Sequence, residues 1–299
     1  MIIDIHEHAY LFEQINYLPN ASDSFLTVEK LLSIMDAKGI DKAVLLPLAN
    51  AESPAPVQNV GELLQICKLY PERFIPFCNI DPRLPKDPDK ITADDFIFIL
   101  NRFKDCGCKG IGEITARVYI DSPCMMSFFK AAGEVGLPAL IHMITPDFDS
   151  YGLMDEVGLK RLECVIRNFP KLKMIGHSPA FWNEISGDVT PEIKNEYPTG
   201  SVKQGGTLVR LLREYQNLYC DMSAGSGLNA LQRDPDYTWK FIEEFQDRLM
   251  LGLDHCSVTD DIQHIEWLTN ARKDGNIKGQ AYEKLMWKNA NKILGLGLE

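Results

Sequence analysis

Eight short apolar runs recur along the 299 residues, and most of them are separated by stretches with helical periodicity. Short continuous apolar runs between helices are typical of buried parallel strands, whose neighbours are connected through a helix. The eight runs cover residues 2–5, 44–48, 74–80, 110–114, 138–142, 172–177, 218–222 and 249–254. Eight strand–helix units in a chain of this length predict an α/β fold in which the sheet closes into a (β/α)8 TIM barrel.

The clearest helical pattern lies at residues 27–38. Its apolar residues recur at the i, i+3, i+4 and i+7 spacing of one helix face, and they are Val28, Leu31, Leu32 and Met35. Thr27 suits the N-cap, and Gly39 suits the left-handed position that ends a helix. Further helices are predicted at residues 125–135, 159–168, 206–215, 239–246 and 280–294. Such helices provide the crossovers that a parallel barrel needs.

An open, doubly wound sheet is the main alternative to the barrel. Such a sheet normally carries a glycine-rich phosphate-binding turn after its first strand, and no such turn follows Ile5. The apolar content of 45% suffices for one large core. We therefore predict a single barrel domain over residues 1–299, with the functional site at the carboxyl ends of the strands.

The charge of the chain limits its partners. A formal net charge of -11 argues against nucleic acid and anionic membrane as main partners, but it is compatible with a small-molecule substrate, including a carboxylate. No run of about 18 apolar residues is present, and the N-terminus lacks the basic segment of a secretory signal. The eight cysteines are scattered, as expected for reduced thiols. We expect a cytoplasmic protein, and a homo-oligomer is compatible with the sequence.

Two histidines, His6 and His8, follow the first apolar run with one residue between them. Side chains alternate along a strand, so the two imidazoles point to the same side and Glu7 points to the other. Three further side chains that can bind metal end other predicted strands, and these are His142, His177 and Asp254. Each alone is more simply explained as a structural residue. Because four of the six histidines end strands of one barrel, we predict a metal site at its mouth.

The motifs around these residues resemble the amidohydrolase superfamily, in particular the amidohydrolase-related (amidohydrolase 2) branch, which includes aminocarboxymuconate-semialdehyde decarboxylase-like enzymes. The resemblance covers nearly the whole chain and rests on the segments Asp4-Ile5-His6-Glu7-His8, Ile141-His142, Ile175-Gly176-His177-Ser178-Pro179, Gly252-Leu253-Asp254 and Lys288-Asn289-Ala290-Asn291. It implies a barrel in which a divalent metal, usually zinc, is held by His6, His8, His142 and Asp254. It also implies that His177 lies beside the metal and orients or polarises the substrate.

The chain departs from the family pattern at two positions. Members with two metals commonly bridge them with a carboxylated lysine on the fourth strand, where this chain has Glu113. Glu113 could bridge a second metal or hold a hydrogen bond behind the first one, and we expect one zinc ion per chain. The decarboxylase-like relatives often carry Asp-Tyr-Pro after the last strand, where this chain has Asp254-His255-Cys256.

These residues favour a metal-dependent hydrolase that acts on an amide, ester or lactone bond of a small organic substrate. Asp254 would take a proton from water as general base, and His177 would hydrogen-bond the substrate oxygen on which negative charge develops. The alternative is a metal-dependent lyase, a decarboxylase or hydratase, which would act on a small carboxylic acid with the same residues. A metal-free barrel is a distant third reading, because it gives no reason for the clustered histidines.

Three residues beyond the metal ligands are candidates for substrate binding. Arg83, in the loop predicted after residues 74–80, and Arg117, four residues past Glu113, could pair with a substrate carboxylate. Both would otherwise be ordinary surface arginines. Trp182, in the long connection 178–204, could wall an aromatic or sugar-like substrate, or could pack in the core instead.

Overall fold

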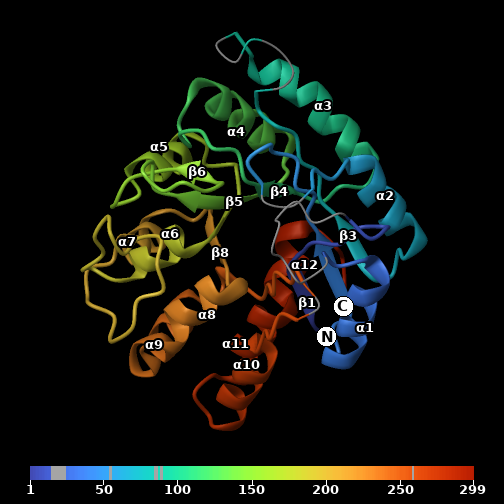
Figure 1. Cartoon of the computed structure of the whole chain (residues 1–299). Coiled ribbons are helices and arrows are strands. Elements are labelled where there is room, and N and C mark those ends of the chain that lie inside the picture. Colours follow the sequence, from blue (N-terminus) through green and yellow to red (C-terminus); the bar gives the residue numbers. More distant parts are fainter. Residues whose placement is uncertain (15–24, 54–55, 84–86, 88–89, 258) are drawn as a thin grey trace.

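In the described residues, eight parallel strands surround one axis, and helices surround the strands (Figure 1). The computed structural model describes residues 1–14, 25–53, 56–83, 87, 90–257 and 259–299. The barrel strands are β1 (Ile3–Glu7), β2 (Lys42–Leu45), β3 (Phe74–Pro76), β4 (Ile111–Ile114), β5 (Ala139–Ile144), β7 (Met174–His177), β8 (Leu218–Asp221) and β9 (Leu249–Met250). Each strand lies at one of the eight predicted apolar runs, and the paired neighbours run parallel.

Two further sets of contacts close the sheet. β1, β2 and β3 form one hydrogen-bonded set of strands, and β4, β5, β7, β8 and β9 form the other. Backbone hydrogen bonds of Cys78 with Gly110 and Gly112, both 2.9 Å long, join β3 to β4. On the opposite side, the N–H of Ile5 donates to Leu251 O at 3.0 Å and joins β1 to β9. The start and the end of the chain, blue and red in Figure 1, therefore lie side by side. The (β/α)8 barrel predicted from the sequence is confirmed.

The helices connect the strands and cover the outside of the barrel. They are α1 (Val28–Lys38), α2 (Val60–Leu69), α3 (Ala93–Asp105), α4 (Pro123–Val135), α5 (Lys160–Asn168), α6 (Pro179–Trp182), α7 (Thr207–Glu214), α8 (Ala224–Gln232), α9 (Pro235–Phe245), α10 (His264–Lys273), α11 (Gly279–Glu283) and α12 (Asn289–Leu294). The helix predicted at residues 27–38 is confirmed, with Gly39 in the left-handed conformation at its end. The helix predicted at residues 280–294 is interrupted by a π-helical turn, Lys284–Lys288. A two-residue strand, β6 (Leu153–Met154), pairs with β5 and has no counterpart in the predicted pattern. None of the helices in the described ranges is long and apolar enough to cross a membrane.

Neighbouring residues on a strand belong to two different apolar clusters. In β2, Ala43 and Leu45 pack with the helices, whereas Val44 packs with Ile5 of β1 and Ile75 of β3. This alternation places the larger cluster between the sheet and the helices and the smaller cluster inside the barrel. The smaller cluster also contains three residues of α12, which are Ala290, Ile293 and Leu294. α12 therefore covers the end of the barrel at which the strands begin.

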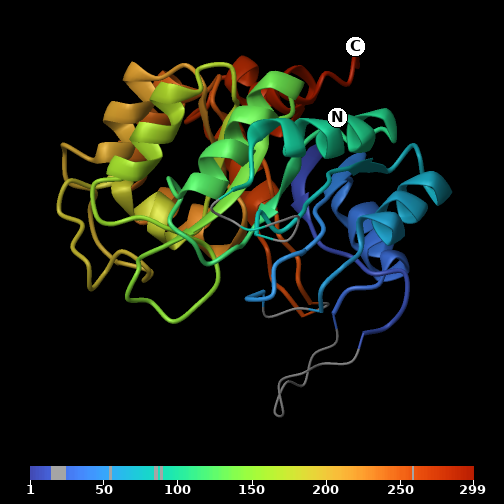
Figure 2. The same cartoon turned by 90° about the horizontal axis from the view of Figure 1, so that it is seen from above.

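The described parts of the loops that follow the strands lie at the opposite end of the barrel, which is the lower side in Figure 2. A buried ion pair fixes the long loop 178–206, because Lys194 Nζ lies 3.0 Å from Glu184 Oε1 and both side chains are 0% exposed. Lys194 Nζ also donates to Glu156 O at 2.5 Å. Glu184 Oε1 accepts from the N–H of Gly158 at 2.7 Å. These bonds tie the loop to the segment that follows β6.

Removing one partner of this ion pair should destabilise the protein more than removing both. Glu184→Gln leaves the Lys194 ammonium buried without its counter-charge, and we expect a loss of about 3–5 kcal/mol in the free energy of unfolding. The Glu184→Gln/Lys194→Met double variant removes both charges and should lose less. Urea unfolding of both variants and the wild type measures this. A loss below about 1 kcal/mol in Glu184→Gln would show that the ion pair does not fix the loop.

Candidate metal centre

The two histidines of the first strand point their Nε2 atoms at each other. The Nδ1–H of His6 donates to Asp221 Oδ2 at 2.6 Å, and the Nδ1–H of His8 donates to Leu46 O at 2.8 Å. Because both acceptors require a proton on Nδ1, each neutral ring carries its lone pair on Nε2. The two Nε2 atoms lie 3.1 Å apart. Lone pairs that face each other at this distance repel unless a proton or a cation lies between them.

Two carboxylates complete this group of donors. Glu113, in β4, has Oε2 3.4 Å from His8 Nε2 and 3.7 Å from His6 Nε2. Asp254, which follows β9, has Oδ1 3.5 Å from each of these nitrogens. Ligand atoms held about 2.1 Å from one tetrahedral ion lie about 3.4 Å apart. Each carboxylate oxygen therefore lies at about this spacing from both histidine nitrogens, and the four side chains have the chemistry of a divalent-metal site.

A second group of donors adjoins the first. Glu113 Oε1 lies 2.8 Å from His142 Nδ1 and 3.9 Å from His177 Nε2. Asp254 Oδ2 lies 3.6 Å from His177 Nε2. Glu113 thus presents one oxygen to the first-strand histidines and the other to His142 and His177, whereas the second oxygen of Asp254 faces His177 alone. The structure brings the five predicted strand-end residues into one buried to half-buried cluster with Glu113 between the two groups.

Asp221 of β8 belongs to this centre, although the sequence pattern does not single it out. Besides its bond to His6, Asp221 Oδ2 lies 3.3 Å from His177 Nδ1 and accepts from Ser223 Oγ at 2.6 Å. Ser223 Oγ accepts from the Nδ1–H of His177 at 2.9 Å, which directs the Nε2 of His177 to the cluster. Gly252 makes the packing possible, because a Cβ there would clash with Asp221 Oδ1. The signal available in the sequence was an acidic residue at the end of a predicted strand.

The electrostatics of the centre favour a positive charge at its middle. Burial disfavours a protonated His6, but the carboxylates of Asp254 and Asp221 outweigh burial and raise the pKa of His6 well above its usual range. Burial also opposes ionisation of Glu113 and Asp221, yet the neighbouring histidines lower the pKa of both carboxyl groups. A divalent cation would satisfy the same negative field and would compete with protons for the histidine nitrogens.

A hydrogen-bonded network behind β1 holds the first and last strands in register. His255 Nδ1 donates to Glu7 Oε1 at 2.6 Å, and Asp4 Oδ1 accepts from the N–H of His6 at 3.0 Å. Burial raises the pKa of Glu7 to about 8. Asp254 adopts a positive φ of 60°, and its N–H donates to His6 O at 2.7 Å. The network therefore fixes the carboxylate of Asp254 next to the two histidines of the first strand.

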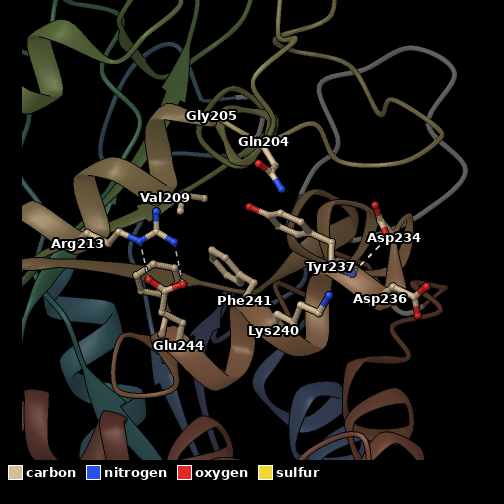
Figure 3. A pocket seen from close by; sticks show the side chains of 11 residues that line it. Gln204, Gly205, Val209, Arg213, Asp234, Asp236, Tyr237, Lys240, Phe241 and Glu244 are labelled. Atoms are coloured by element: carbon tan, nitrogen blue, oxygen red, sulfur yellow. Dashed lines mark hydrogen bonds and ion pairs between the residues drawn. The ribbon is translucent and has the colours of Figure 1, made fainter.

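A cavity of about 80 Å³ opens onto the centre. Its lining combines residues of the cluster with aromatic, apolar and small polar side chains: His8, Glu113, Asp254, Tyr10, Phe25, Leu48, Tyr151, Ser53 and Cys256. A second cavity, of about 210 Å³, adjoins it at Tyr151 and reaches His142. A larger groove of about 540 Å³ lies between α7 and α9 on the outside of the barrel (Figure 3). The described lining of that groove contains no histidine, so the barrel mouth is the candidate site.

The two arginines predicted to bind substrate are committed to other partners. Arg83 pairs with Glu52 at 2.6 and 2.9 Å and with Asp81 at 2.5 Å. Arg117 donates to two backbone carbonyl oxygens in the segment 146–148. Neither arginine lines the two cavities at the barrel mouth. The structure therefore differs from the sequence prediction, because neither guanidinium is placed to bind a substrate carboxylate.

Trp182 also differs from its predicted role as a substrate wall. The side chain is fully buried and packs against Phe181 and Phe241. Its Nε1–H donates to Asp221 O at 2.8 Å. Of the two readings left open by the sequence, the structure supports core packing, in which Trp182 holds the backbone of Asp221 from behind.

Asp221→Asn should weaken metal binding without unfolding the barrel. An amide can present N–H to His6 Nδ1 in place of an acceptor oxygen, and this removes the bond that selects the His6 tautomer. Loss of such a contact behind a metal-binding histidine lowers metal affinity by about 10- to 100-fold. Competition with a chelator measures the change, with Asp247→Asn, at an exposed ion pair with Lys284, as the matched control. Equal metal affinity in the two variants would show that Asp221 does not select the tautomer.

Comparison with known proteins identifies the family of this chain. The chain matches the amidohydrolase family (Amidohydro_2) over residues 4–296. A solved amidohydrolase from Burkholderia multivorans with bound zinc has 12% identity and a TM-score of 0.64, and the match covers 99% of each chain. A probable 2-pyrone-4,6-dicarboxylic acid hydrolase from Acinetobacter baumannii, with citric acid bound, has 14% identity and a TM-score of 0.60, with 98% of this chain and 99% of that chain covered.

A dihydroxybenzoic acid decarboxylase from Polaromonas sp., with bound manganese and the inhibitor 2-nitroresorcinol, is also similar. It has 15% identity and a TM-score of 0.59, with 100% of this chain and 98% of that chain covered. Comparison with curated proteins gives no match. At these identities the structural likeness shows the fold, and the similar structures include hydrolases as well as a decarboxylase. Because the family match spans nearly its whole length, the chain belongs to the amidohydrolase family, as a metal-dependent enzyme.

Proposed function

We propose that this protein is a metal-dependent hydrolase that cleaves an amide, ester or lactone bond of a small organic substrate, with residues 1–299 as one catalytic domain. The observation that carries the proposal is the convergence of His6 Nε2 and His8 Nε2, 3.1 Å apart, beside the Asp254 carboxylate. Two imidazole lone pairs next to a carboxylate form a site for a divalent cation and place a general base beside it.

One ion, zinc by preference, would be held by His6 Nε2, His8 Nε2, Asp254 Oδ1 and Glu113 Oε2. Imidazole and carboxylate donors suit zinc, and two similar structures contain zinc or manganese. This set has Glu113 in place of His142 of the sequence prediction, because the donor atoms grouped with His142 are the other Glu113 oxygen and His177. A second ion would be held by that group, and His177 would then be a ligand instead of a hydrogen-bond donor. The chemistry that a divalent ion would supply in the first group is a lowered pKa of bound water, about 7, and polarisation of a substrate carbonyl.

Asp254 is the proposed general base. It presents one oxygen to the first-strand histidines and the other to His177, and its side chain is 14% exposed, so water can reach it. Asp254 would take the proton of the attacking water and pass it to the leaving group. His177 Nδ1 lies 3.3 Å from Asp221 Oδ2, and this contact directs Nε2 toward the cluster. With a proton on Nε2, His177 would donate from that nitrogen to the substrate oxygen on which negative charge develops.

A metal-dependent decarboxylase is the second candidate, and the similarity to a dihydroxybenzoic acid decarboxylase favours it. Such an enzyme must bind the carboxylate that it removes. The lining described for the two cavities includes no lysine and no arginine, and Arg83 and Arg117 are committed elsewhere. A carboxylate would depend on the metal alone for its counter-charge. An uncharged ester, lactone or amide has no such requirement, which supports hydrolysis.

The test follows the fate of labelled water. Zinc-loaded protein in oxygen-18 water is given small esters, lactones and amides. It is given separately 2-pyrone-4,6-dicarboxylate and a dihydroxybenzoate, the compounds for which similar proteins are named. We expect label in the product carboxyl group, because the new carbon–oxygen bond comes from water. Mass spectrometry of the product measures the label, and the His6→Ala/His8→Ala variant serves as the inactive control.

A decarboxylase would release carbon dioxide and place a solvent proton on carbon. Stoichiometric carbon dioxide with no label in the organic product contradicts the hydrolase proposal. The fold and the metal-binding cluster would stand after that result.

A further inference from the structure

Tyr151, in the segment between β5 and β6, stands between the two cavities at the barrel mouth. It lines the cavity of about 80 Å³ that reaches His8 and Asp254, and also the cavity of about 210 Å³ that reaches His142. Its ring lies against the His142 ring, with centroids 4.6 Å apart and planes inclined by 48°. A substrate group that approaches the cluster through either cavity therefore meets Tyr151.

The backbone holds Tyr151 at this place. β6 pairs with β5 directly after it, and the N–H of Gly152 donates to Thr115 O at 2.9 Å. Gly152 has a φ of 131°, and a Cβ there would lie 3.0 Å from His142 Cδ2. Glycine tolerates both this conformation and this contact, which other residues do not. These backbone contacts therefore hold the Tyr151 ring against the His142 ring.

The Tyr151 hydroxyl makes no hydrogen bond within the part of the chain that the structure describes. Tyr10, in the same cavity, already donates its hydroxyl to Pro56 O at 2.6 Å. Ser53 Oγ, which lines the cavity too, is buried with no partner among the described residues. A phenol is protonated at neutral pH, so Tyr151 has a donor available for a group bound beside it.

We propose that Tyr151 determines substrate specificity: its ring limits the size of the group that reaches the metal centre, and its hydroxyl donates a hydrogen bond to that group. The inference rests on the proposed metal-dependent hydrolase. A cavity of about 80 Å³ is smaller than the roughly 150 Å³ in which a buried apolar site holds benzene. The acyl group that reaches His8 and Asp254 through this cavity is therefore a short aliphatic one, and Tyr151 confines aromatic groups to the cavity of about 210 Å³.

The experiment compares two metal-chelating probes of different size, acetohydroxamate and benzohydroxamate, by calorimetric titration of zinc-loaded protein. Tyr151→Ala joins the two cavities and should raise the affinity for benzohydroxamate relative to acetohydroxamate by about 10-fold or more. Tyr151→Phe keeps the ring and should leave this ratio unchanged, while both affinities fall by about 3- to 10-fold because the hydrogen bond is lost. Tyr237→Phe, in the groove between α7 and α9 (Figure 3), is the matched control and should equal the wild type.

The outcomes distinguish a failure of the inference about Tyr151 from a failure of the proposed metal-dependent function. An unchanged affinity ratio in Tyr151→Ala, with both probes binding, overturns the role of Tyr151 and leaves the metal centre intact. Wild-type affinities in Tyr151→Phe overturn the hydrogen bond. If neither probe binds the zinc-treated wild type, the assignment of the metal centre is wrong, and the inference about Tyr151 fails with it.

Discussion

The hydrogen bond between Asp221 and His6 decides which nitrogen of His6 faces the barrel axis, and the rest of the centre depends on that choice. With the proton held on Nδ1, the Nε2 lone pair points at the Nε2 of His8 and at the Asp254 carboxylate. Buried groups of this kind repel one another unless a cation joins them. The contacts that close the barrel maintain the arrangement, because the N–H of Asp254 donates to His6 O and Gly252 leaves room for Asp221. The contacts that close the sheet therefore also hold the side chains of the metal centre in place.

The fold and most of the cluster could be predicted because both depend on local pattern. Each strand is a continuous apolar run, and the carboxyl ends of parallel barrel strands meet at one face whatever the connections between them. His6, His8, His142, His177 and Asp254 end such runs, so their convergence follows from the strands alone. The two-residue strand β6 could not be predicted, because its pairing depends on the position of β5 rather than on its own sequence.

The remaining features depend on contacts between distant residues. In the sequence, Asp221 is only an acidic residue at a strand end, and its role follows from its contact with His6, 215 residues earlier. Arg83 was predicted to face a substrate because its partner Glu52, 31 residues away, could not be known. A tryptophan fits a cavity wall and a core equally well, and only the packing of Trp182 behind β8 separates the two. Pairing of polar side chains is a tertiary property that single-sequence patterns do not carry.

The metal content of the purified protein tests the central claim most directly. After incubation with zinc and removal of unbound ions, elemental analysis should find about one tightly held ion per wild-type chain, as expected for two imidazoles and two carboxylates. The His6→Ala/His8→Ala variant should retain almost none while its circular dichroism and melting show a folded barrel. Wild-type metal content in that folded variant, or no retained metal in the wild type, would contradict the assignment of the cluster as a metal centre.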